Sequence, residues 1–402
     1  MAGTMPEPRT VRTIELHLED MAYQGAAIGR EDGRVVFAEY GIPGEDVVVA
    51  IERDRKDHSL GRVVAVRTPS PQRVDPPCPY FGVCGGCQWQ HIRYEHQLVL
   101  KQHVVRQQLR RIGKFEDPPV SPTVPSPNQF GYRNHARFSV DGNGNLGYIS
   151  RPGHGYRFIR IDRCLIMHPK INEVLGRLQG KAFVKHQLMV RYGINTGELL
   201  VQPDVSAIDP EIPSGQRFYH ESLLGHRFRI SASSFFQTNT GVAERLVQLV
   251  LERIAPTGRE VVVDAYAGVG TFAAFLAPRV ARVIGIEEAP SAVDDARVNL
   301  DQFDNVEYVM AKVEQVLGKL AVRPDVVILD PPRVGCAPEA LTGVLMLRPP
   351  RIVYVSCDPA TLARDLRKLV DGGYRLLDVT PLDMFPQTYH IESVATLELA
   401  VE

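Results

Sequence analysis

The stretch that decides the fold is Val261-Val262-Val263-Asp264-Ala265-Tyr266-Ala267-Gly268-Val269-Gly270-Thr271. Its three β-branched residues predict a short buried strand that ends on the carboxylate of Asp264. Gly268 and Gly270 then allow a tight turn and a close approach of the backbone to a ligand, and Thr271 opens a predicted helix. A strand, a glycine-rich turn and a helix in this order indicate a nucleotide-binding loop.

A second apolar strand, Ala281–Ile286, runs into Glu287, whose carboxylate can accept both hydrogen bonds of a ribose diol. The spacing Gly268-x-Gly270-x-x-Ala273 matches the dinucleotide fingerprint, which is a weak signal by itself. The acidic residue placed shortly before the first glycine, in the pattern D-x-x-x-G-x-G, instead resembles the S-adenosylmethionine loop of class I methyltransferases. A glycine turn that binds no ligand is the remaining alternative.

Composition limits the number of domains, the partners and the compartment. At 402 residues the chain is long enough for two or three domains. A net charge of −1 excludes a globally basic nucleic-acid binder, so any contact with a polyanion must be local. No apolar run approaches the ~18 residues of a membrane span and the first residues do not resemble a signal peptide, so we expect a cytoplasmic protein without membrane contact. The six cysteines then suggest metal binding or catalysis before disulfides.

The N-terminal part reads as a series of short strands separated by glycine-rich turns. Five or so strands in this length predict a small closed β-barrel, which is either an oligonucleotide-binding module or a docking module. A proline-rich linker, Ser70–Pro77, follows it. The predicted strands are Val11–Leu18, Val35–Ala38, Val47–Arg53 and Gly61–Val66.

Three cysteines come next, in the pattern Cys78-x5-Cys84-Gly-Gly-Cys87, and a fourth, Cys164, lies far downstream. Three close thiolates and a remote one suit a four-cysteine site that holds either an iron–sulfur cluster or zinc, and the spacing does not choose between them. The spacing differs from the C-x3-C-x2-C of radical S-adenosylmethionine enzymes. We expect a long helix over Gln88–Gly113.

The block Gly131–Arg163 is predicted to be rich in β-structure, with a hairpin turn at Asp141–Gly144. Arginines interleaved with aromatic residues suit phosphate contact and base stacking on single-stranded or looped RNA, and an arginine-decorated sheet is the alternative. A further α/β stretch and the segment Ser231–Asn239, which contains Gln237, lead to the next helix. The arginines are Arg133, Arg137, Arg151, Arg157, Arg160 and Arg163, and the aromatic residues are Tyr132, Phe138, Tyr148, Tyr156 and Phe158.

From Val261 onward strands and helices alternate, which predicts a mostly parallel, doubly wound sheet. Its later strands run into Asp330-Pro-Pro-Arg333 and into Ser356-Cys357-Asp358-Pro359. Ligands bind beyond the carboxyl ends of such strands, so one crevice should be lined by Asp264, Glu287, Asp330 and Cys357.

Cys357 is predicted to be a nucleophile. Asp358 can cap the next helix, and the field at a helix N-terminus should lower the thiol pKa from ~8.5 toward neutrality. A thiolate beside a methyl donor suits addition to carbon 6 of a pyrimidine, which makes carbon 5 able to take a methyl group. A base must then remove the carbon-5 proton, and Glu392 is the candidate.

The whole chain resembles the RNA uracil-5-methyltransferases, in particular the branch that modifies large-subunit ribosomal RNA. The segments that carry this resemblance are Pro69-Ser-Pro-Gln-Arg-Val74, the three-cysteine segment, Gly131-Tyr-Arg-Asn134, Ser234-Phe-Phe-Gln237-x-Asn239, Asp264-x-Tyr266-x-Gly268-x-Gly270, Asp330-Pro-Pro-Arg333, Ser356-Cys357-Asp358-Pro359-x-Thr361-Leu-Ala-Arg-Asp365 and His390-x-Glu392.

The resemblance implies an α/β protein with a TRAM or OB-like barrel over residues 10–68, a central α+β domain for RNA and the cluster over 69–255, and a Rossmann-like class I methyltransferase domain over 256–402. It further implies a monomer that methylates 23S ribosomal RNA, with a tRNA uridine as the alternative substrate. Cys357 would be the nucleophile and Glu392 the base. S-adenosylmethionine would contact Gln237, Asp264, Tyr266, Gly268, Gly270, Glu287 and Asp330, and a 4Fe-4S cluster would be held by Cys78, Cys84, Cys87 and Cys164.

Other enzyme classes fit less well. Cytosine-5 methyltransferases place the catalytic cysteine directly after the D-x-P motif, where this chain has Arg333, and Cys336 lies further on. Amino-methylating enzymes place an aromatic residue there. An RNA-binding or electron-transfer iron–sulfur protein without methyltransferase activity is the alternative from another class, and the joint presence of Asp264, Cys357 and Glu392 argues against it.

Overall fold

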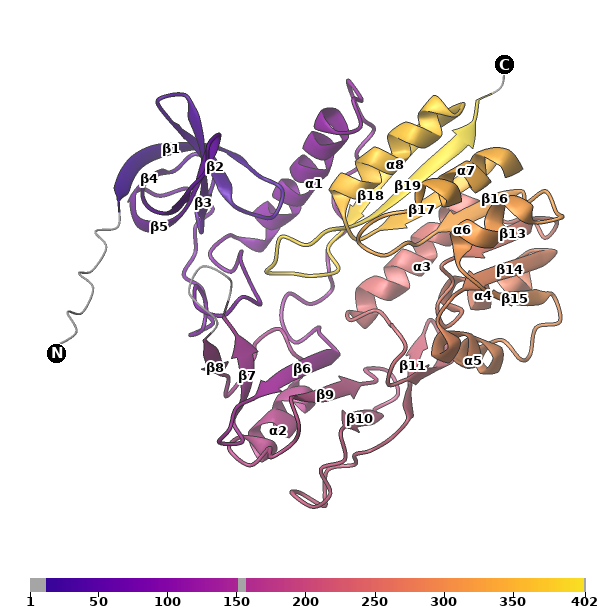
Figure 1. The fold of residues 1–402 in the computed structure, drawn as a ribbon, viewed down its shortest axis with the longest axis horizontal. Helices are drawn as coiled ribbons and strands as arrows, with labels where there is room; N and C mark the ends of the chain where they lie inside the picture. The colour runs from indigo at the N-terminus through magenta and orange to yellow at the C-terminus, as the bar shows by residue number, and fades with distance from the viewer. Residues whose placement is uncertain (1–11, 151–156, 401–402) are drawn as a thin grey trace, which may run out of the picture. The chain divides into compact units, whose positions relative to one another are not determined.

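The computed structural model describes residues 12–150 and 157–400 of the chain (Figure 1). Arg151, Tyr156 and the first residue of the predicted strand Val11–Leu18 therefore lie outside the described residues. The chain divides into two compact units. The N-terminal unit comprises Met1–Leu100, Ser150–Tyr156 and Gln387–Tyr389, and the C-terminal unit comprises Lys101–Ile149, Arg157–Pro386 and His390–Glu402.

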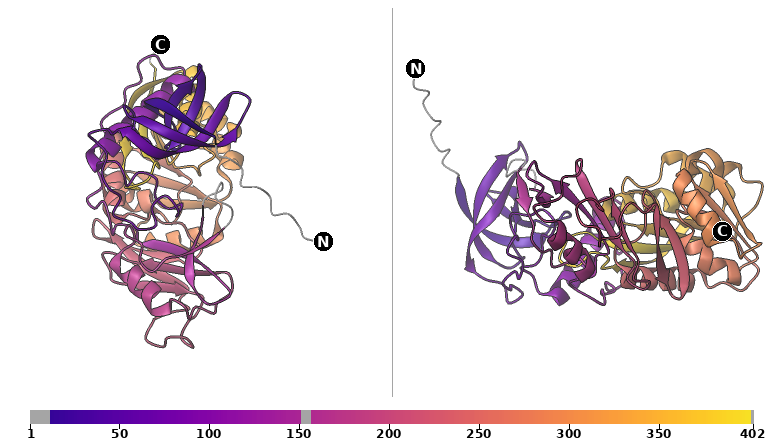
Figure 2. Two further views of the ribbon diagram at one scale, coloured as in Figure 1. Left: turned by 90° about the vertical axis from the view of Figure 1, so that its left-hand side faces the viewer. Right: turned by 90° about the horizontal axis from the view of Figure 1, so that it is seen from below.

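The N-terminal unit contains the predicted barrel (Figure 2). The barrel closes in the order β1-β2-β3-β5-β4. Its interior is apolar, with Leu18, Val36 and Val49 fully buried. The short β2 did not stand out in the sequence because only its first three residues are buried. The strands are β1 (Thr13–Met21), β2 (Ala27–Glu31), β3 (Arg34–Glu39), β4 (Asp46–Asp54) and β5 (His58–Thr68).

Helix α1 spans Tyr94–Arg111, so the prediction of a helix from Gln88 to Gly113 is wrong at its start. The backbone N–H groups of Gln88 and Trp89 both donate to the carbonyl of Gln387. The indole N–H of Trp89 donates to the carbonyl of Gly25 over 3.0 Å. These bonds fix the segment in a turn, so the helix begins only after it.

The first part of the C-terminal unit is an antiparallel sheet in the order β10-β9-β6-β7-β8, accompanied by the hairpin β11–β12. The predicted turn at Asp141–Gly144 joins β6 to β7, and the Asp141 carboxylate accepts hydrogen bonds from the backbone of Asn143 and Asn145. The elements are β6 (His135–Val140), β7 (Leu146–Ile149), β8 (Phe158–Arg160), α2 (Pro169–Leu178), β9 (Gln187–Tyr192), β10 (Leu199–Gln202), β11 (Phe218–Leu223) and β12 (His226–Ser231).

The second part of this unit is a seven-stranded sheet in the order β15-β14-β13-β16-β17-β19-β18, as the doubly wound prediction requires. The first five strands are parallel, and β19 runs antiparallel between β17 and β18. The strands are β13 (Val261–Ala265), β14 (Arg282–Glu287), β15 (Val306–Met310), β16 (Val326–Leu329), β17 (Arg351–Ser356), β18 (Tyr374–Leu382) and β19 (Glu392–Leu399).

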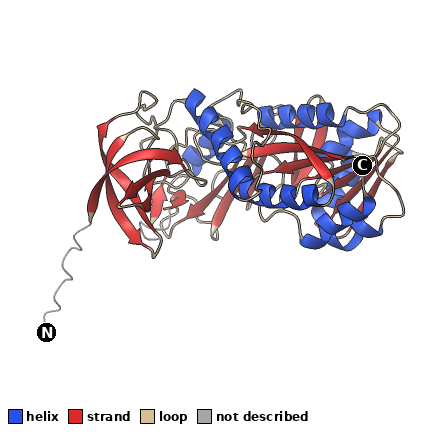
Figure 3. Cartoon of the chain, turned by 90° about the horizontal axis from the view of Figure 1, so that it is seen from above, coloured by secondary structure: helices blue, strands red, loops and turns tan. Residues whose placement is uncertain are grey.

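Helices cover both faces of this sheet (Figure 3). Successive strand residues point to opposite faces, so Val262 packs into one core with residues of α3, α4 and α5, while Val263 points to the other side. No helix in residues 12–150 or 157–400 is long and apolar enough to cross a membrane. The helices are α3 (Thr240–Ile254), α4 (Thr271–Leu276), η1 (Ala277–Arg279), α5 (Pro290–Asn299), α6 (Val313–Val316), η2 (Leu317–Lys319), α7 (Pro338–Leu347) and α8 (Pro359–Asp371).

Candidate active site

The sheet brings four of the predicted site residues to one edge. Asp264 is the last residue but one of β13, and Glu287 is the last residue of β14. Asp330 directly follows β16, and Cys357 directly follows β17. Because β13, β14, β16 and β17 are parallel, all four residues lie at the carboxyl edge.

The loop that follows β13 is held by a hydrogen bond to the side chain of Glu287. The Glu287 carboxylate accepts hydrogen bonds from the N–H of Gly268 over 2.9 Å and from the N–H of Ala289 over 2.8 Å. Gly268 has a φ of 55°, and no atom lies within 4 Å of the position that a Cβ would take there. Gly270 has a φ of 88°, and a Cβ would come within 2.8 Å of the Leu300 side chain. The loop therefore needs glycine at 270 for packing and leaves open space at 268.

Asp264 is fully buried, and neither of its carboxylate oxygens accepts a hydrogen bond from the described residues. Burial, and secondly the charge of Asp330, raise the pKa of Asp264 to about 8. Burial also raises the pKa of Asp330 to about 7. A buried carboxyl group without a partner is costly, so this edge carries acceptor capacity that the protein itself does not use.

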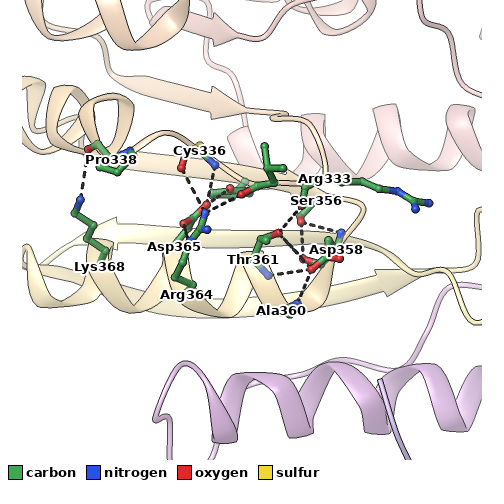
Figure 4. A network of polar contacts seen from close by, with 12 residues as sticks. Arg333, Cys336, Pro338, Ser356, Asp358, Ala360, Thr361, Arg364, Asp365 and Lys368 are labelled. Atoms are coloured by element: carbon green, nitrogen blue, oxygen red, sulfur yellow. Dashed lines mark hydrogen bonds and ion pairs between the residues drawn. The ribbon is translucent and has the colours of Figure 1, made fainter. Parts of the chain in front are cut away.

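Tyr266 adopts a φ of 65°, which is unusual for a residue with a side chain. Burial, and secondly Cys336, raise its pKa. Cys336 is buried in a closed polar network (Figure 4): its N–H donates to Asp365 over 2.9 Å, and the Tyr354 hydroxyl donates to the same carboxylate over 2.6 Å. Arg364 donates to Asp365 over 2.8 Å. This network of hydrogen bonds to Asp365 holds the backbone of Cys336 in place within the protein interior.

Cys357 is half-buried at the start of α8. As predicted, Asp358 caps this helix: its carboxylate accepts hydrogen bonds from the N–H groups of Ala360 and Thr361, each over 3.0 Å (Figure 4). The predicted fall in the thiol pKa is wrong, because burial, followed by the charge of Glu392, raises the pKa of Cys357 to about 12. The Arg333 guanidinium opposes this rise.

Glu392 also lies at the carboxyl edge, because it is the first residue of β19, which runs antiparallel to β17. Because β19 is antiparallel to β17, Ser393 pairs with Ser356, which places Glu392 beside the residue that follows β17. Glu392 is buried, and burial and the Asp330 charge raise its pKa well above the ordinary range, while Arg333 lowers it. The predicted nucleophile and the predicted base are therefore neighbours.

Arg333 is a further candidate functional residue, for which the sequence predicted no role. Its charge acts on both Cys357 and Glu392, and its Nη2 lies 3.2 Å from Nδ1 of His390. Burial, and secondly Arg333, lower the pKa of His390 to about 3, so this imidazole is neutral and can accept the bond. The position directly after the Asp-Pro-Pro motif was the available signal, because that motif follows a strand at the carboxyl edge.

The segment before α3 is anchored on a buried carboxylate. Asp295 accepts hydrogen bonds from Arg229, from the N–H and hydroxyl of Ser231 and from the hydroxyl of Ser234. Gln237 follows; its side chain is half-buried, and its backbone carbonyl accepts a hydrogen bond from the side-chain amide of Asn134. The structure ties Gln237 into this segment and does not link its side chain to the carboxylates.

The four cysteines predicted to bind a cluster are divided between the two units. All four cysteines are half-buried and none of them is in a disulfide; Cys78, Cys84 and Cys87 belong to the N-terminal unit and Cys164 to the C-terminal unit. Burial raises the pKa of Cys84, and Cys78 adds to that rise. In the part of the chain that the structure describes, no group of three or more His, Cys, Asp or Glu side chains is arranged to hold a metal ion.

The predicted RNA-contacting block is only partly exposed. Arg137 and Arg157 are exposed, as phosphate contact requires. Tyr132 and Phe138 are buried, and Phe138 packs against Tyr148 with their ring centroids 5.5 Å apart. The prediction that these two aromatic residues stack on RNA bases is therefore wrong, because they belong to the core of the sheet.

Comparison with known proteins gives a consistent assignment. Residues 222–399 match the family model of tRNA (uracil-5-)-methyltransferases, and residues 9–64 match the TRAM domain. A relative from Halalkalibacterium halodurans, named an uncharacterized RNA methyltransferase, is 36% identical and covers 96% of this chain and 97% of its own length. A second from Gloeobacter violaceus with the same description is 37% identical, over 99% of this chain and 100% of the relative.

Among solved structures, the tRNA (uracil-54, C5)-methyltransferase of Pyrococcus abyssi, in complex with S-adenosyl-L-homocysteine, superposes with a TM-score of 0.73. It is 28% identical in sequence, and the match covers 96% of this chain and all of that one. The N-terminal barrel, the methyltransferase sheet and the relatives of full length agree, and the chain belongs to the RNA uracil-5-methyltransferase family.

Proposed function

We propose that the protein transfers a methyl group from S-adenosylmethionine to carbon 5 of a uridine in RNA, through a covalent bond between Cys357 and carbon 6. The observation that carries this proposal is the placement of a thiol and a buried carboxyl group, Cys357 and Glu392, side by side at the carboxyl edge of the sheet. An acid- and glycine-containing loop opens on the same edge. Nucleophile, base and methyl donor are the three components that this reaction needs.

The residues at the loop fit the methyl donor. The unpartnered carboxyl group of Asp264, the open space at Gly268 and the carboxylate of Glu287 offer a cradle with unused acceptors. Asp330 adds another carboxyl group to this edge. When bound, S-adenosylmethionine supplies an activated methyl group with a positive charge on sulfur, which such carboxylates favour.

The chain's own side chains account for the other steps. The Cys357 thiol gives its proton to solvent and its sulfur forms a bond to carbon 6 of the uracil, while the electrons of the double bond between carbons 5 and 6 move through carbon 5 onto the oxygen of carbon 4, which forms an enolate. Carbon 5 then takes the methyl group. Glu392 as carboxylate accepts the carbon-5 proton, the sulfur–carbon bond breaks, and the double bond between carbons 5 and 6 is restored. Arg333 favours the charged forms of both Cys357 and Glu392.

Two observations bear on the RNA substrate, and they point to different classes of RNA. The sequence motifs resemble the branch that acts on 23S ribosomal RNA, whereas the similar Pyrococcus abyssi structure is named for a tRNA uridine. We propose ribosomal RNA as the substrate and tRNA as the second candidate. Mapping 5-methyluridine in both RNA classes, from cells with and without this gene, decides between them.

The variant Glu392→Gln tests the order of events. Gln keeps the shape and hydrogen bonding of Glu but cannot accept the proton, so the enzyme should methylate RNA once and then remain joined to it. With methyl-labelled donor we expect an RNA–protein band that survives denaturing electrophoresis and carries the label. Adding Cys357→Ala must remove that band. Turnover by Glu392→Gln at the wild-type rate would refute the assignment of the base, and Asp358 and His390 would be tested next.

We also propose a 4Fe-4S cluster, and this proposal rests on the donor set alone, the side chains of Cys78, Cys84, Cys87 and Cys164. No step of the reaction above depends on it. Protein purified without oxygen should be brown and contain about four irons if the cluster is present. Replacing Cys164 should then remove as much iron as replacing Cys87, and colourless protein would end the proposal.

A further inference from the structure

The loop between β18 and β19 leads directly into Glu392, and it is held in an unusual way. Three successive backbone carbonyls in this loop, those of Met384, Phe385 and Pro386, each accept a hydrogen bond from a side chain. The three donors come from separate parts of the C-terminal unit. They are Asn239, which caps α3, Lys101 of α1, and Tyr132, which precedes β6.

The Lys101 contact is the most constrained of the three. Its Nζ lies 2.5 Å from an oxygen of Asp383 and 3.1 Å from the Phe385 carbonyl. Both charged side chains are fully buried. A lysine removed from water at a cost of several kcal/mol must keep its partner, so this pair fixes where Asp383 and Phe385 can lie.

The other two contacts are neutral and buried. The Tyr132 hydroxyl donates to the Pro386 carbonyl over 3.0 Å, and Nδ2 of Asn239 donates to the Met384 carbonyl over 3.2 Å. At the far end of the loop His390 contacts Arg333 and packs edge-on against the Phe385 ring, with centroids 5.7 Å apart. The loop has no helix or strand of its own, so these side chains supply the bonds that regular structure would provide.

We propose that Lys101, Tyr132 and Asn239 are positioning residues that hold this loop so that Glu392 reaches the carbon-5 proton. The inference rests on the proposed function, because it gives Glu392 the role of base. A base must lie within hydrogen-bond reach of the proton it removes, and a displacement of about 1 Å can cost about a hundredfold in rate. The three residues would act on the step that Glu392 performs and leave thiol attack and methyl transfer to Cys357 unaffected.

The chain offers a matched control for this proposal. Tyr374 is a second buried tyrosine whose hydroxyl donates to a proline carbonyl, that of Pro349, over 2.9 Å. It lies at the start of β18, at the opposite end of the strand from the loop. Tyr132→Phe and Tyr374→Phe thus remove the same bond in two places and should lower the melting temperature by similar amounts.

The readout that separates positioning from stability is the covalent adduct. With labelled donor and substrate RNA, Tyr132→Phe should release the methylated adduct about tenfold more slowly than wild type. Methylated RNA–protein complex should therefore accumulate, while the rate of its formation stays unchanged. Tyr374→Phe should form and release the adduct as wild type does. Equal release rates in the two variants would overturn the proposal.

A second variant guards against a folding defect. Asn239→Asp keeps the oxygen that caps α3 but loses the donor to the Met384 carbonyl, so it should also accumulate adduct. Hydrogen exchange of the peptide over residues 383–392 gives a readout that needs no chemistry, and it should be faster in Tyr132→Phe than in Tyr374→Phe. If neither the wild-type protein nor Glu392→Gln forms an adduct, the proposed function fails. Exchange alone then decides whether these residues fix the loop, and equal exchange in both variants overturns that.

Discussion

The two edges of the seven-stranded sheet differ in whether their ionisable side chains have hydrogen-bond partners. At the carboxyl edge, Asp264 is buried and accepts no hydrogen bond from residues 12–150 or 157–400, and burial raises the pKa of Cys357 and of Glu392. At the amino edge, Arg351 bonds to Glu398 over 2.6 Å, and Asp325 accepts a bond from the N–H of Val261 over 2.8 Å. One edge leaves polar groups unsatisfied, and the other pairs them.

The amino edge nevertheless has a hollow of about 370 Å³, lined by residues that include Arg351, Glu398 and Asp325. Shape alone would make it a candidate for ligand binding. Three of its charged side chains, Arg351, Glu398 and Asp325, already form hydrogen bonds within the protein, so a ligand would have to compete for them. The difference teaches that buried polar groups without partners, rather than a hollow, distinguish the edge where we propose that the reaction takes place.

The strongest test of this difference compares two cysteines of the carboxyl half. Cys357→Ala removes the proposed nucleophile and should lower methyl transfer more than about a thousandfold, while donor binding remains measurable. Cys336→Ser should keep activity within about tenfold of wild type, because Cys336 belongs to the network around Asp365. Methyl transfer to substrate RNA and equilibrium binding of the donor are the measurements. Loss of activity in Cys336→Ser alone would move the nucleophile and reopen the cytosine-5 alternative.

A smaller effect should appear in stability against pH. The pKa of Asp264 is about 8 in the folded protein and ~3.9 in an unfolded chain, so between these values only the folded state keeps the proton. The favourable contribution is complete below about pH 4 and is lost as the pH rises through about 8, by up to about 1.4 kcal/mol per pH unit. Asp264→Asn should flatten this fall, measured as the free energy of unfolding in urea. An unchanged slope would show that Asp264 is not buried as described.

The smallest effect is expected at the amino edge. Arg351 and Glu398 are each about one-third exposed, so their coupling in a double-mutant cycle of Arg351→Gln and Glu398→Gln should stay below about 1 kcal/mol. The variants should methylate RNA at the wild-type rate per folded molecule. Slower methylation by these variants would break the comparison, because it would give the hollow at the amino edge a part in the reaction.

Much of this architecture could be predicted because it depends on local pattern. The alternation of strands and helices after Val261 gave the parallel sheet, and the residues that follow its strands gave the reactive edge. The pKa of Cys357 could not be predicted in this way. The helix N-terminus beside Cys357 is a local feature and was predicted correctly. Burial and the charge of Glu392 raise the pKa of this thiol, and only the folded chain brings these two effects to Cys357.

Burial within the N-terminal half was equally hard to predict. Tyr132 and Phe138 stand between arginines in a pattern that suggests an exposed RNA-binding surface, yet both are core residues. The start of α1 was missed because the backbone before it bonds to Gln387, near the other end of the chain. Such contacts leave no periodic signal in the sequence.

The reversed direction of β19 makes strand alignment itself a determinant of activity. Side chains of a strand alternate between its two faces, so removing one residue from within β19 would turn every side chain beyond that point to the opposite face. The pairing of Ser393 with Ser356 places Glu392 beside Cys357. Length changes in this family should therefore accumulate in surface turns such as Asp141–Gly144, and β19 should keep its length even where its composition drifts.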